Sequence, residues 1–153
     1  MSPSTTATVP RGTVAVTIGV DSQSDGFYWL LSCWGRKMEI WLPLTGRITG
    51  DMRSEEVWGA LLEALTTTWL DHDGNAYRPV ISALDVQGDF YPQCLEFVRA
   101  NGFKCRLRAI RGYAIGRAQA AGRSFVDFKT FPFVSKYDRF TMAKRRFERW
   151  VSI

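Results

Sequence analysis

Two aspartates that each follow an apolar stretch are the residues of this chain whose type and placement most favour catalysis. Asp21 follows the run AVTIGV, and Asp85 follows the run PVISAL. Two carboxylates that lie close together repel each other, and a divalent cation between them removes that cost. Carboxylate oxygens suit Mg²⁺ or Mn²⁺, and two such ions about 3.5 to 4 Å apart activate water and stabilise the leaving oxygen in phosphodiester cleavage. The pair is therefore a candidate metal site.

Each aspartate also has a purely structural interpretation. Asp21 could open a turn over residues 22–26, because Asp side chains bond nearby backbone N–H groups and Asp-Gly tolerates hairpin geometry. Asp85 could be the N-cap of a following helix. Both alternatives stay open as long as the two residues are considered alone.

The first part of the chain has the pattern of an antiparallel sheet. Residues 13–20, 27–34 and 38–44 are rich in β-branched or aromatic residues and are separated by turn residues, which predicts three strands in a meander. Ser54 then has the type of a helix N-cap, with acidic residues in the first turn and apolar residues at helical spacing after it. We expect this helix to end near residues 73–74.

Strand and helix alternate in the next part of the chain. Residues 79–85 form a continuous apolar run, which predicts a strand buried on both faces. A second helix is expected over residues 89–101, where Asp89 either caps the helix or lends an outer oxygen to the metal site, and Asn101-Gly102 ends it. A further strand is expected over residues 104–110.

This order of elements indicates an α/β domain with an RNase H-like mixed sheet: three antiparallel strands, then helix, strand, helix and strand, flanked by helices. In that topology the first strand lies beside the strand that follows the first helix. Asp21 and Asp85 are therefore expected to project from neighbouring strand ends. We expect the domain to span residues 13–153, after a flexible segment of residues 1–12.

Composition indicates one globular domain. The 153 residues are 46% hydrophobic and 14% aromatic, which is enough for a sizeable core. No apolar run approaches the roughly 20 residues of a membrane span, and no export signal is visible. The single histidine, His72, lies in an Asp-His-Asp-Gly loop that predicts a surface turn. The cysteines are odd in number and lack CxxC spacing, so buried thiols in a reducing cytoplasm are expected at Cys33, Cys94 and Cys105.

Charge is divided unevenly along the chain. Residues 1–101 carry 7 Lys and Arg against 12 Asp and Glu, whereas residues 102–153 carry 13 against 3. A basic segment with interleaved aromatic residues attracts a polyanion such as double-stranded DNA. The alternative is a solvated basic face over an ordinary core. Candidate DNA contacts are Arg111, Arg117, Arg123 and Lys144, the last on an expected basic helix that includes Arg149.

Five stretches together are similar to one known family: VPRGTVAVTIGVDSQSD, CWGRKMEIWLPLTGRITGD, EEVWGALLEALTTTW, DGNAYRPVISALDVQGDF and LRAIRGYAIGRA. With these stretches the chain resembles the nuclease domain of the lambda-type (GpA family) phage terminase large subunit, which cuts concatemeric viral DNA during packaging. The resemblance runs from about Val9 to Trp150. It preserves the spacing between the two aspartates.

The resemblance implies a metal-dependent DNA endonuclease whose acidic cluster includes the positions of Asp21 and Asp85, and it favours metal ligation over a turn role for Asp21. It implies Mg²⁺ or Mn²⁺ as cofactor, double-stranded DNA as substrate, and the terminase small subunit, motor domain and portal as partners in the host cytoplasm. Arg111 matches a basic residue of the family, where it contacts either the cleaved phosphate or DNA further away.

Two departures from the family pattern affect these expectations. No GxxxxGK[ST] sequence occurs, so the ATP-driven motor that precedes this domain in full large terminases is not expected in this chain. The family's final helix, which carries another acidic ligand, has no counterpart before Ile153. We therefore expect weak metal binding and slow cleavage that is better in Mn²⁺. The alternative is a non-catalytic DNA-binding or terminase-assembly module, such as a prophage remnant, with an incomplete metal site.

Overall fold

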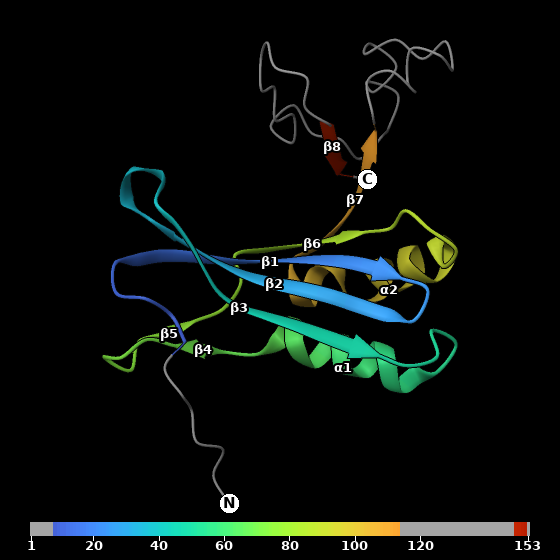
Figure 1. Ribbon diagram of the computed structural model, residues 1–153, viewed down its shortest axis with the longest axis horizontal. Coiled ribbons are helices and arrows are strands. Elements are labelled where there is room, and N and C mark those ends of the chain that lie inside the picture. The colour runs from blue at the N-terminus through green and yellow to red at the C-terminus, as the bar shows by residue number, and fades with distance from the viewer. Residues whose placement is uncertain (1–7, 114–148, 153) are drawn as a thin grey trace, which may run out of the picture.

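A computed structural model describes residues 8–113 and 149–152 of the chain. Figure 1 shows a sheet with two helices packed against it. The elements are, in chain order, β1 (Thr13–Gln23), β2 (Gly26–Gly35), a 3₁₀ turn (Arg36–Met38), β3 (Ile40–Thr49), α1 (Glu55–Thr66), β4 (Trp69–Leu70), β5 (Ala76–Tyr77), β6 (Ile81–Asp85), α2 (Tyr91–Cys105), β7 (Leu107–Tyr113) and β8 (Arg149–Ser152). None of these helices has the length and apolar character needed to cross a membrane.

Six of the strands form one mixed sheet in the order β3-β2-β1-β6-β7-β8. The first three are antiparallel neighbours, and β6 lies parallel to β1 on its other side. Strand β7 is parallel to β6 and pairs with β8 in the antiparallel direction. The predicted meander and the order of strands and helices that follows it are therefore confirmed. Strand β8 was not predicted: Arg149 lies in this strand and not in a helix.

The core lies on one face of the sheet. Strand β1 buries alternate residues, and the buried side chains of α1 and α2 belong to the same hydrophobic cluster. Both helices lie behind the strands in Figure 1. The core residues contributed by β1, β2 and α1 are Val16, Ile18, Val20, Phe27, Leu31, Cys33, Val57, Leu61 and Leu65.

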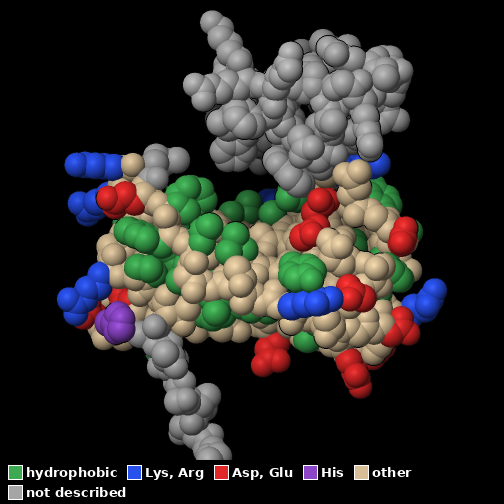
Figure 2. Space-filling model, viewed as in Figure 1, with side chains coloured by type: hydrophobic (Ala, Val, Ile, Leu, Met, Phe, Trp, Pro, Cys, Tyr) green, Lys and Arg blue, Asp and Glu red, His purple; other side chains and the backbone are tan. Residues whose placement is uncertain are grey.

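The opposite face is not covered by a helix within the described residues. Ile81 of β6 is 44% exposed and Tyr28 of β2 is 45% exposed, whereas Ser82 and Leu84 are fully buried. The prediction that residues 79–85 form a strand buried on both faces is therefore wrong. Figure 2, viewed onto this open face, shows hydrophobic side chains with acidic and basic ones beside them.

The first helix is shorter than its apolar pattern predicts. Ser54 caps it as expected, since its hydroxyl accepts a hydrogen bond from the backbone N–H of Glu56. The helix ends at Thr66, whose hydroxyl donates back to the carbonyl of Leu62 at 2.8 Å. Side chains of this type compete with the backbone for hydrogen bonds and favour helix ends. Residues 69–77 instead form the small hairpin of β4 and β5.

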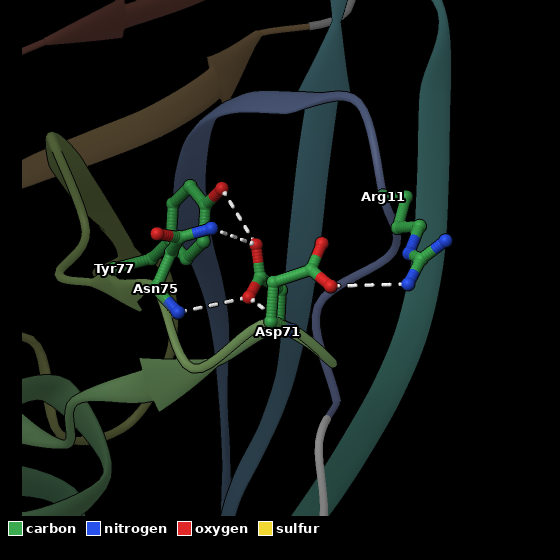
Figure 3. Close-up of polar contacts among 5 residues, drawn as sticks. Arg11, Asp71, Asn75 and Tyr77 are labelled. Carbon is green, nitrogen blue, oxygen red and sulfur yellow. Dashed lines mark hydrogen bonds and ion pairs between the residues drawn. The ribbon is translucent and has the colours of Figure 1, made fainter.

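A buried aspartate organises that hairpin (Figure 3). Asp71 is only 6% exposed, and its carboxylate accepts two hydrogen bonds from Asn75 and one from the hydroxyl of Tyr77. The bonds from Asn75 contribute most to lowering the pKa of Asp71 below its usual value. Val9 is buried against this hairpin, and its backbone N–H donates to Leu70. His72 is exposed in the turn, as predicted.

The second helix is displaced along the chain from its predicted position. It begins at Tyr91 after Phe90, so Asp89 does not cap it, and it continues through Asn101 to Cys105. Asn101 stays helical because its amide donates to the carbonyl of Phe97, and the helix ends where Arg106 adopts a left-handed conformation. Strand β7 consequently begins at Leu107, later than predicted.

All three cysteines are free and buried, as predicted. Burial is the largest cause of the raised pKa of each thiol. The thiols are therefore protonated members of the core.

Candidate functional site

Asp21 and Asp85 lie side by side. The parallel pairing of β1 with β6 aligns Asp21 directly with Asp85. Both occupy strand positions that face away from the helices, because the residues before them, Val20 and Leu84, are buried in the core. The expected juxtaposition of the two carboxylates is therefore confirmed, and it lies on the open face of the sheet.

The two structural interpretations of these aspartates are wrong. Asp21 is a paired strand residue, since β1 continues to Gln23 and the turn is made by Ser24 and Asp25. Asp85 cannot cap α2, which begins only at Tyr91. Its Oδ1 atom instead accepts a hydrogen bond of 3.0 Å from the backbone N–H of Gln87.

Ser22 and Gln23, which follow Asp21, make hydrogen bonds to the two aspartates. The sequence analysis did not predict a role for either residue. The side-chain amide of Gln23 donates to Oδ2 of Asp21, from the same face of β1. The hydroxyl of Ser22 donates to the carbonyl of Asp85 at 2.8 Å and ties the end of β1 to the end of β6. The only signal in the sequence was the polar segment Ser22-Gln23-Ser24, which is equally typical of a turn.

The charge of Asp85 is poorly compensated. Burial is the largest cause that raises its pKa, and the neighbouring carboxylate of Asp21 raises it further. The N–H of Gln87 and the charge of Arg111 act in the opposite direction. A cation bound between the two aspartates would favour their ionised forms.

The donor set fits a divalent cation in part. Two carboxylates on adjacent strands offer the oxygen ligands that Mg²⁺ and Mn²⁺ prefer. A polar hollow of about 430 Å³ adjoins them, and its lining includes Asp21, Asp85 and Asp89. Even so, no group of three or more His, Cys, Asp or Glu side chains within residues 8–113 and 149–152 is arranged to hold an ion. Among the described residues, the candidate site therefore has two acidic side chains, Asp21 and Asp85.

One candidate DNA contact lies close to this pair. Arg111 is on β7, its guanidinium lies 5.8 Å from the ring centroid of Tyr91, and its charge acts on Asp85. Arg117, Arg123 and Lys144 lie outside the described residues.

The sheet order and the paired acidic residues at adjacent strand ends define an α/β domain with a candidate metal-binding pair. The family model described as terminase large subunit gpA, endonuclease domain, matches residues 1–130. The chain therefore belongs to this family of endonuclease domains, which confirms the resemblance inferred from its sequence. Comparisons with curated proteins and with solved structures gave no match.

Proposed function

We propose that this chain is a divalent-metal-dependent DNA endonuclease with an RNase H-like fold, which cuts concatemeric viral DNA during packaging. Its membership of the gpA endonuclease family and the alignment of Asp21 with Asp85 support this proposal. The sheet order, with an antiparallel meander followed by two parallel strands, agrees with an RNase H-like topology. The alignment of the two aspartates is the observation that carries the proposal.

Asp21 and Asp85 are the residues that would hold Mg²⁺ or Mn²⁺. When bound, such an ion supplies a Lewis acid and a route to an activated water for phosphodiester cleavage. The amide of Gln23 orients the carboxylate of Asp21, and the N–H of Gln87 holds one oxygen of Asp85. Hydrogen bonds of this kind fix the direction of metal ligands. Arg111 follows Ile110, the register partner of Asp85, and we propose that it attracts a DNA phosphate near the end of the strand.

In a full assembly we propose that the domain acts with the terminase small subunit, the motor domain and the portal, in the cytoplasm of the host cell. The family, which is that of a terminase large subunit, supports these partners.

A non-catalytic DNA-binding or terminase-assembly module is the second candidate function. It is favoured by the finding that the described residues bring together only two acidic ligands. Mg²⁺ demands near-octahedral oxygen ligation, which two carboxylates leave mostly to water and substrate.

Nicking of supercoiled plasmid distinguishes the two functions. We expect slow conversion to the open circular form in Mn²⁺, slower conversion in Mg²⁺ and none in EDTA, because Mn²⁺ tolerates an incomplete ligand set better. Adding a segment that carries a further acidic ligand is expected to accelerate cleavage. DNA binding without any metal-dependent nicking would favour the assembly module, and rapid cleavage in Mg²⁺ would show that the metal site is already complete.

We further propose that the basic part of the chain after residue 101 contacts DNA. This part has 13 Lys and Arg residues against 3 Asp and Glu, which supports the proposal. Replacing Arg111, Arg117 and Arg123 by Ala is expected to reduce the magnitude of the slope of log K against log[salt] by about 2 to 3. Each phosphate contact contributes about 0.9 to this slope, because it releases condensed counterions. Anisotropy titrations of a labelled duplex at several salt concentrations measure this slope. An unchanged slope would place the DNA contacts elsewhere.

A further inference from the structure

A row of side chains crosses the open face of the sheet at the level of the two aspartates. The strand registers join its members in the order Arg47, Tyr28, Asp21 and Asp85. Neighbouring strands lie about 4.8 Å apart, so the row spans roughly 14 Å. Figure 2 shows acidic, hydrophobic and basic side chains adjoining one another on this face. A basic and an aromatic side chain therefore continue the line of the candidate metal ligands.

Tyr28 and Arg47 are held together and are accessible. The guanidinium of Arg47 lies 5.0 Å from the centroid of the Tyr28 ring, and Tyr28 is 45% exposed. Arg47 also forms an ion pair of 2.7 Å with Asp25, in which the two side chains are 49% and 59% exposed. Exposed ion pairs of this kind are weak, so Arg47 can exchange Asp25 for a phosphate at little cost.

A hollow of about 630 Å³ adjoins the row. Both aspartates line it together with Tyr28, Arg47 and Gly19. Gly19 lies two residues before Asp21 on the same face, and a Cβ atom added there would meet nothing within 4 Å. The hollow is therefore open beside the carboxylates, and it has an aromatic ring and a cation at its other side.

We propose that Tyr28 and Arg47 form a subsite for a single nucleic-acid strand beside the Asp21–Asp85 pair. The guanidinium of Arg47 binds a backbone phosphate through paired hydrogen bonds. The ring of Tyr28 stacks on an adjacent base, an interaction that tolerates any sequence. The inference rests on the proposed function only in taking the bound strand to be the one that is cut.

Charge explains why such a subsite is needed. The two carboxylates repel a phosphate until a cation neutralises them. Arg47 supplies attraction about two strand spacings from Asp21, which is close enough to hold a strand next to the pair without neutralising it. Stacking on Tyr28 requires an exposed base, so the subsite selects DNA that is unpaired near the cut over fully paired duplex.

The test measures binding in EDTA, where no cleavage occurs. Anisotropy of a labelled oligothymidylate and of a duplex of equal length is recorded at several salt concentrations. Arg47→Gln is expected to weaken oligothymidylate binding about tenfold and to lower the salt slope by about 0.7. Tyr28→Leu is expected to weaken oligothymidylate binding between about fivefold and a hundredfold and to leave the salt slope unchanged. Tyr28→Phe keeps the aromatic ring and should bind the oligothymidylate as the parent does.

Three further variants sharpen the test. Gly19→Leu places an apolar side chain in the hollow, where a Cβ atom meets nothing within 4 Å, and is expected to weaken binding. Asp25→Asn releases Arg47 from its ion pair and is expected to strengthen binding. Arg11→Gln is the matched control, since Arg11 forms a similar exposed ion pair of 3.0 Å with Asp73 near the opposite end of β1, and its slope should not change. Thermal melting verifies that each variant is folded.

The outcomes separate this inference from the proposed nuclease activity. If Arg47→Gln and Tyr28→Leu bind the oligothymidylate with the parent's affinity and slope, the subsite is wrong, even where the parent cleaves plasmid. If the parent itself does not bind the oligothymidylate, the subsite is also wrong. If the variants lose binding as expected while the parent fails to cleave, the subsite stands and the nuclease proposal fails.

Discussion

Asp85→Asn and Asp21→Asn are each expected to reduce Mn²⁺-dependent plasmid nicking by roughly 100-fold or more. Loss of a residue that only orients a metal ligand costs about 10- to 100-fold, and the ligand itself should cost at least as much. The two residues approach the proposed ion from adjacent strands. The remaining carboxylate therefore cannot take the place of the one that is removed. Calorimetric titration with Mn²⁺ is expected to show that each substitution abolishes binding.

Asp73→Asn is the matched control for these variants. Asp73 is also an exposed carboxylate, but it lies in the turn of the β4–β5 hairpin, where it pairs with Arg11 and takes no part in the aligned pair. It should leave both Mn²⁺ affinity and nicking unchanged. If the Asp21→Asn, Asp85→Asn double variant bound Mn²⁺ as tightly as the parent, the aligned pair would not be the metal site.

The melting temperature in EDTA shows whether a loss of activity in Asp85→Asn comes from a folding defect. The pKa of Asp85 is raised in the folded protein, chiefly by burial. Its favourable contribution to stability is therefore complete below the unfolded pKa of about 3.9, and it is lost as the pH rises through the higher folded pKa. Asp85→Asn is consequently expected to melt at or above the temperature of the parent at pH 7 without metal, and below it when Mn²⁺ stabilises only the parent.

Phe27→Ala is expected to destabilise the protein by about 3 to 5 kcal/mol, the usual cost of removing a buried phenyl ring. Phe27 is 1% exposed, and its ring packs edge-on against Trp58 with centroids 5.0 Å apart. This destabilisation combines the loss of buried apolar surface, the loss of the ring contact and the cost of the cavity that remains. Urea unfolding followed by tryptophan fluorescence measures it, with the midpoint falling at a nearly constant slope.

The adjacent residue provides the control. Tyr28 follows Phe27 on β2 but points to the open face, so Tyr28→Ala should cost about 1 kcal/mol or less. Phe27→Ala is therefore expected to lower the stability of the protein, whereas Tyr28→Ala is expected to affect nucleic-acid binding with little change in stability. Equal destabilisation by both would mean that the face opposite the helices is covered and cannot hold the proposed subsite.

Local patterns in the sequence determined the elements and their order. The alternation of apolar residues predicted the meander, and Ser54 with the acidic residues after it predicted the start of α1. The order of these elements was enough to place Asp21 beside Asp85, because a strand that follows a crossover helix pairs in parallel with a strand already formed. The family was equally accessible from the sequence, since its match spreads over most of the chain.

Helix boundaries depended on contacts that the local pattern does not contain. The apolar spacing of α1 continues past Thr66, but the bonds that Asp71 accepts from Asn75 and Tyr77 favour a hairpin there. Asn101 has the type of a helix end, yet the helix continues through it to Cys105, and the side-chain amide of Asn101 donates to the carbonyl of Phe97.

Only the tertiary structure decided which face of the sheet carries the site and what shares it. A strand's side chains alternate between faces, so a shift of one residue in register would exchange Phe27 with Tyr28 and bury Asp21. Nothing in the residues around Arg47 indicates that it lies in line with Asp85 from three strands away. The pairing of β3, β2, β1 and β6 placed it there, because register is determined by the packing of the whole core against the two helices.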